Sequence, residues 1–185
     1  YFVAPNESPR LSNTFLSCVK AKRLLYKRIS PSSSELLIFE ESGIEVPAKN
    51  ISEIFELKNS ISNCSFITLV GGSTLVAHHQ IMDAIASSDF GIISYPPSHH
   101  IDNRIPTKLY EYQACQLPIL IQDYEPWIKL CQPYSAALVL DFQNIDPAAL
   151  LEKMATTQFY TSRPTDVTWA SEETKFLQRI KEILA

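Results

Sequence analysis

The chain has 185 residues, of which 45% are hydrophobic and 19% are charged, with 16 basic against 20 acidic side chains and a net charge of −4. This composition excludes general disorder, and the mild acidity disfavours a protein that coats nucleic-acid phosphates. The length predicts one domain over residues 1–185. The sequence opens at Tyr1 without a basic leader, so we expect a piece of a longer protein that is cytoplasmic and not secreted.

Short apolar runs recur along the chain, and their β-branched and aromatic content favours strands. The predicted strands are residues 1–4, 35–39, 65–70, 90–95, 118–121 and 136–140. Most of them are apolar throughout, which is typical of strands that are buried on both faces of a parallel sheet.

Segments with helical periodicity separate the strands. The predicted helices are residues 11–29, 79–87, 106–116, 146–156 and 168–184. Asp146 and Pro147 predict an N-cap and a first helical residue. Residues 30–34 and 48–50 are expected to be connectors, and residues 158–167 an irregular crossing. The alternation predicts an α/β fold with a doubly wound parallel sheet.

Several common sites are not supported by the sequence. The four glycines form no dinucleotide-binding fingerprint, phosphate loop or nucleophile elbow. The four cysteines form no C-x-x-C pair, and each lies in or beside an apolar stretch, which favours buried reduced thiols. We expect neither a metal nor another cofactor.

The densest polar cluster follows the strand at residues 90–95 and leads into the helix at residues 106–116. In an open α/β sheet this junction lies where ligands bind. Thr107 is the expected N-cap, and Lys108 with Arg104 would add positive charge beside free backbone N–H groups, which suits a phosphate. Glu111 could accept hydrogen bonds from sugar hydroxyls. Alternatively, Lys108 and Glu111 form an ordinary surface ion pair, an interpretation that spacing alone favours.

Two stretches resemble a known family. They are D-F-G-I-I-S-Y-P-P at residues 89–97 and P-T-K-L-Y-E-Y-Q-A-C-Q-L-P-I-L at residues 106–120. They are similar to the C-terminal, donor-binding half of GT-B glycosyltransferases, most of all the group 1-like bacterial enzymes that build surface polysaccharides. The resemblance implies a Rossmann-like domain in which Lys108 binds the nucleotide diphosphate and Glu111 the ribose hydroxyls.

Other segments extend the resemblance. The strand at residues 66–70, followed by Gly71 and Gly72 and then a helix ending in A-S-S-D, resembles a block of the family. In the family the loop after this strand usually lines the base pocket, which makes residues 71–76, Gly71 and Gly72 among them, base-contact candidates. Trp169 opens a stretch that resembles the closing helix of the family. Asn103 stands where many relatives carry a Glu that contacts the donor sugar, and Arg10 is a candidate second phosphate ligand. Gln116 stands where the family has Gly.

The resemblance implies a hexosyltransferase that moves a sugar from a UDP- or GDP-linked donor to a glycan or lipid-linked acceptor. Its N-terminal domain would carry the acceptor site and any catalytic base, so we expect this piece alone to be inactive. The basic run from Lys20 to Arg28 is interpreted as a solvated helix face, and the alternative is contact with the anionic inner face of a membrane.

A noncatalytic α/β module, such as a receiver or a ligand-sensing domain, is the alternative from another class. A receiver needs an Asp at the end of a central strand, and Asp123 and Asp141 are the candidates. Neither has the acidic pair near the first strand that would complete a metal site.

Overall fold

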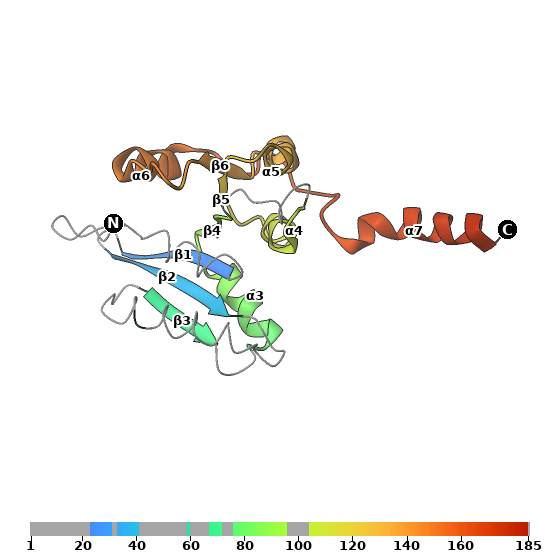
Figure 1. Cartoon of the computed structure of the whole chain (residues 1–185), viewed down its shortest axis with the longest axis horizontal. Helices are drawn as coiled ribbons and strands as arrows, with labels where there is room; N and C mark the ends of the chain where they lie inside the picture. The colour runs from blue at the N-terminus through green and yellow to red at the C-terminus, as the bar shows by residue number, and fades with distance from the viewer. Residues whose placement is uncertain are drawn as a thin grey trace.

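A computed structural model of the chain describes residues 23–30, 33–40, 59, 67–71, 76–95 and 104–184. Within these ranges, six strands form one sheet in the order β3-β2-β1-β4-β5-β6 (Figure 1). The strands are β1 (Arg23–Ser30), β2 (Ser33–Glu40), β3 (Ile67–Gly71), β4 (Phe90–Ile93), β5 (Ile119–Gln122) and β6 (Ala137–Leu140). The predicted strand at residues 1–4 and the predicted connector at residues 48–50 lie outside the described residues.

The α/β class is confirmed, but the sheet is mixed. β2 pairs parallel with β3, and β4, β5 and β6 pair parallel with one another. β1 lies between β2 and β4 and is antiparallel to both, with Leu24 opposite Ile38 and Ile92. Five strands therefore run in one direction, and the prediction of an all-parallel sheet is wrong for β1.

The prediction of a helix over residues 11–29 is wrong for the part that the structure describes, because Arg23–Ser30 is strand β1. Only two residues separate β1 from β2 in the sequence, which is the commonest length for a β-hairpin connection. Leu25 and Tyr26 are both buried but belong to different core clusters. Neighbours that face opposite sides are typical of a strand, so the predicted 30–34 connector shrinks to the hairpin turn.

Five helices lie in the described part of the chain: α3 (His78–Ala86), α4 (Thr107–Ala114), α5 (Glu125–Cys131), α6 (Pro147–Thr156) and α7 (Trp169–Leu184). A short 3₁₀ helix, η1 (Gln132–Tyr134), follows α5. Sequence reasoning predicted α3, α4, α6 and α7 but missed α5. Asp146 caps α6 as predicted, accepting hydrogen bonds from the backbone N–H groups of Ala148 and Ala149. Residues 158–167 form no helix or strand, as predicted.

Two hydrophobic clusters sandwich the sheet. On one face, buried residues of α3, α4 and α5 pack against Leu25, Ile93, Ile119 and Ile121. On the other face, Leu150 and Met154 of α6 pack against the strand residues that point to that side of the sheet, among them Tyr26 and Ile92. The helices therefore cover both faces of the sheet, as the doubly wound prediction requires. α7 buries no residue and extends away from the rest of the chain (Figure 1).

Tyr112 fixes α4 against the sheet. Its side chain is fully buried, and its ring lies directly over Gly91 of β4. A Cβ atom at Gly91 would lie 2.5 Å from Cδ2 and Cε2 of the ring. Only glycine allows α4 to approach β4 so closely.

We therefore expect Gly91→Ala to lower the free energy of unfolding by about 1–3 kcal/mol, because the added methyl group overpacks a buried ring. Urea unfolding measures the loss. In a double-mutant cycle with Tyr112→Leu, the double mutant should lose less free energy of unfolding than the sum of the two single losses, since the smaller side chain removes the clash. Full additivity would contradict this account of the contact.

Candidate functional site

The first turn of α4 lies at the edge of the sheet where the five co-directional strands end. α4 leaves the carboxyl end of β4 and returns the chain to the amino end of β5, so it begins at the carboxyl edge. Ligands of open α/β sheets bind outside this edge. The predicted site residues Lys108 and Glu111 both lie on α4.

Lys108 is nearly buried. Its exposed fraction is 9%, and it lies one turn before Tyr112, the residue that covers Gly91. Ser94, which follows β4, is 8% exposed. Lysine side chains are rarely buried to this extent unless they are paired. Most of the Lys108 side chain is therefore covered by the protein and does not extend freely into solvent.

Glu111 follows Lys108 by three residues and is partly buried, with its Oε2 atom enclosed. Residues three apart on a helix share a face. The structure therefore places the cation and the carboxylate on the same side of α4, as the sequence predicted. The alternative of an ion pair between Lys108 and Glu111 stays a prediction, and such a pair would not be fully exposed, because Lys108 is nearly buried and Glu111 is partly buried.

The start of α4 is electropositive for a second reason. The N-cap is Pro106, which has no side chain that can accept a hydrogen bond, and the first turn holds no acidic residue. The helix dipole places about half a positive charge at this end. The prediction of Thr107 as the N-cap is wrong by one residue: Thr107 is the first residue of the helix and is exposed.

The other predicted residues are more widely placed. Arg104 is exposed on the segment that enters α4. Gly71 ends β3 with a φ of 88°, which favours glycine, and pairs with Glu40 of β2. Because β2 and β1 lie between β3 and β4, Gly71 is about 14 Å from β4 along the same edge. Asn103, Gly72 and Arg10 lie outside the described residues.

An aromatic group that sequence reasoning missed borders this edge. Trp127 of α5 is fully buried, and its indole N–H donates a hydrogen bond of 2.9 Å to the backbone carbonyl of Arg104. Its ring meets Tyr95 and Tyr124 edge-on, with centroid separations of 5.9 and 5.1 Å. The sequence shows only a tryptophan shortly after a predicted strand. Its partners Tyr95 and Arg104 are distant in the sequence, so no local pattern indicates the contact.

The chain leaves α4 through a residue whose conformation favours glycine. Gln116 adopts a left-handed φ of 53°. The N–H of Gln116 bonds to the carbonyl of Gln113 at 3.0 Å, and the N–H of Leu117 to that of Tyr112 at 2.9 Å. These two bonds form a Schellman motif, whose left-handed residue is usually glycine.

Cys131 and Tyr160, two buried groups near α4, are poor nucleophiles. Burial raises the pKa of the Cys131 thiol to about 12, and burial also raises the pKa of Tyr160, whose hydroxyl donates to the carbonyl of Leu117. A thiol that stays protonated is unreactive. Cys115, in contrast, is exposed, so the prediction of a buried thiol is wrong there. Cys18 and Cys64 lie outside the described residues.

The structure adds little support for a receiver-type aspartate site or for a metal site. Asp141 is exposed in a turn after β6, where hydrogen bonds from the Asn144 side chain and the Gln143 N–H hold its pKa below the usual value. The described residues contain no group of three metal-ligating side chains. Among those same residues, no helix has both the length and the apolar character needed to cross a bilayer.

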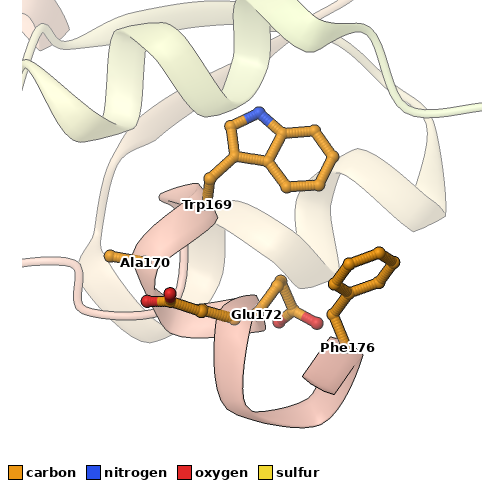
Figure 2. Close-up of a pocket in the computed structure, with 5 residues that line it drawn as sticks. Trp169, Ala170, Glu172 and Phe176 are labelled. Atoms are coloured by element: carbon orange, nitrogen blue, oxygen red, sulfur yellow. The ribbon is translucent and has the colours of Figure 1, made fainter. Parts of the chain in front are cut away.

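A surface hollow is lined entirely by residues of α7. Its lining residues are Trp169, Ala170, Glu172, Glu173 and Phe176 (Figure 2). Two of these five are carboxylates and none is basic, so the hollow would repel a diphosphate. We therefore place the candidate site at α4 and not here.

We expect Gln116→Gly to raise the free energy of unfolding by about 1 kcal/mol, because a left-handed conformation is unfavourable for residues other than glycine. Urea unfolding measures the gain. Gln132→Gly, at an exposed residue with a right-handed φ of −57°, is the control and should be destabilising. An unchanged or lower stability of Gln116→Gly would contradict the conformational account.

Comparisons with models of known protein families, with curated proteins and with solved structures find no match to this chain.

Proposed function

We propose that this chain is the donor-binding domain of a glycosyltransferase, and that it holds a nucleoside diphosphate sugar at the first turn of α4. In this proposal the chain is the C-terminal half of a GT-B fold, and an N-terminal domain carries the acceptor site. Three features support a Rossmann-like half: β4, β5 and β6 pair parallel, helices lie on both faces of the sheet, and the order of the described strands, 3-2-1-4-5-6, is also that of the dinucleotide-binding fold. The antiparallel β1, joined to β2 by a hairpin, departs from that fold. The acceptor in this proposal is a glycan or a lipid-linked molecule.

The burial of Lys108 is the observation that carries the proposal. A cation is stabilised at the C-terminal end of a helix and destabilised at the N-terminal end, where the dipole is positive. Lys108 nevertheless lies in the first turn of α4, where it is only 9% exposed. An anionic ligand at this end would offset both the dipole and the desolvation of the ammonium group.

The position of Glu111 favours a sugar-bearing anion over a free phosphate. A carboxylate accepts two hydrogen bonds from neighbouring hydroxyl groups, as the ribose of a nucleotide offers. Glu111 is three residues beyond Lys108 on the same side of α4 and is partly buried. A ligand that presents phosphate and then a diol along the helix matches this order of groups.

Lys108 and the α4 backbone N–H groups would act on the leaving group. When the bond between the sugar and the diphosphate breaks, negative charge increases on the diphosphate, and fixed positive groups stabilise that charge. The acceptor and the base that activates it belong to the partner domain. The isolated chain is therefore expected to bind donor without transferring sugar.

We expect millimolar UDP or GDP to raise the melting temperature of the chain, because a ligand at a hundredfold excess over its Kd stabilises the folded state by about 2.7 kcal/mol. Lys108→Met should raise the Kd about ten- to a hundredfold, since it removes a charged hydrogen bond while it preserves the aliphatic packing. Glu111→Gln should weaken the binding of nucleotides but leave the binding of inorganic pyrophosphate unchanged. Thermal shift and calorimetric titration measure these effects.

Lys129→Met is the matched control. Lys129 lies on α5 in an exposed ion pair with Glu125, at 3.1 Å, so its loss removes the same charge away from the site. Nucleotide binding should survive this change. Absence of any nucleotide effect on the unmodified chain would favour the noncatalytic module, and equal losses in both lysine variants would indicate nonspecific charge attraction.

A further inference from the structure

Trp127 connects three segments of the carboxyl edge that are far apart in the sequence. Its indole N–H bonds to the carbonyl of Arg104, on the segment that enters α4. Its ring packs against Tyr95, which follows β4, and against Tyr124, which follows β5 and precedes α5. One fully buried side chain therefore links the ends of two strands to the beginning of the candidate site.

The entry to α4 has little packing of its own. The side chains of Arg104 and Ile105 are exposed, and Pro106 is the N-cap. A chain segment with exposed side chains is held by its backbone contacts. The Arg104 carbonyl is such a contact, because Trp127 donates to it at 2.9 Å across 23 residues of sequence.

The indole N–H group is suited to this task. A buried N–H without an acceptor costs free energy, so Trp127 retains its bond only while Arg104 keeps its position. The two tyrosine rings restrict the indole from both strands and leave it few alternative orientations. The result is a fixed hydrogen-bond donor that determines where α4 begins relative to the sheet.

We propose that Trp127 is a positioning residue, which holds the Arg104 segment and thereby sets the affinity of the α4 site for the nucleoside diphosphate. This inference rests on the proposed function. Trp127 touches the entry segment and not the ligand. Its loss should affect binding through the placement of the α4 N–H groups and of Lys108.

The test uses the full 185-residue chain and UDP and GDP as probes. Trp127→Phe keeps an aromatic ring and removes the N–H donor, and we expect the Kd to increase about three- to tenfold. Leu150→Ala is the control, because Leu150 lies in the cluster on the opposite face of the sheet. It should lower the melting temperature more than Trp127→Phe and leave the Kd unchanged.

A spectroscopic measurement supplies an independent readout. The chain has two tryptophans, and Trp169 is 92% exposed on α7. In a Trp169→Phe background, Trp127 is the sole tryptophan, and its fluorescence should change on nucleotide addition with the same Kd as the calorimetric titration. Tyr124→Leu, which removes one of the two flanking rings, should weaken binding in this background and serves if Trp127→Phe does not fold.

The outcomes separate the two proposals. If the unmodified chain binds no nucleotide, the proposed function fails and the role of Trp127 fails with it. If the chain binds but Trp127→Phe and Tyr124→Leu leave the Kd unchanged, only the positioning role is overturned, and Trp127 is a core residue. Weaker binding in both variants, with an unchanged Kd in Leu150→Ala, supports the role.

Discussion

The contact between Tyr112 and Gly91 sets the position of α4, and the candidate site depends on it. The ring lies where any Cβ at Gly91 would be, so helix and strand approach as closely as a backbone allows. Lys108 is one turn closer to the carboxyl edge on the same helix, and the close approach leaves it only 9% exposed. A helix held further from the sheet would leave the ammonium group exposed to water, where it would bind anions only weakly.

Much of the fold could be predicted because burial leaves a simple trace in sequence. β4 and β5 are short, apolar and buried on both faces, so their runs stood out. β1 was missed because its basic residues, Lys27 among them, also fit one face of a helix. α5 was missed because it has seven residues and a proline in its first turn. Two turns give too little periodicity to detect.

The site was predictable only in part, for a related reason. Lys108 and Glu111 are neighbours on one helix, so spacing alone places them on a common face. The hydrogen bond from Trp127 to Arg104 and the contact of Tyr112 with Gly91 join residues 23 and 21 positions apart. Such contacts depend on how helices dock on the sheet, and no local pattern encodes docking. Burial, which distinguishes Lys108 from a surface lysine, is a property of the same docking.

Departures from local rules gather on α4. Its first turn holds a nearly buried lysine against the dipole, the Oε1 atom of buried Gln113 has no hydrogen-bond partner among the described residues, and Gln116 takes a left-handed conformation after its last turn. Each of these features costs free energy, and proteins keep such features mainly where function requires them. The buried residues Leu109 and Tyr112 stabilise the middle of α4 and hold the helix in place despite them. Of the three departures, only Lys108 lies in the first turn, and under the proposed function a bound anion there would offset the cost of its burial.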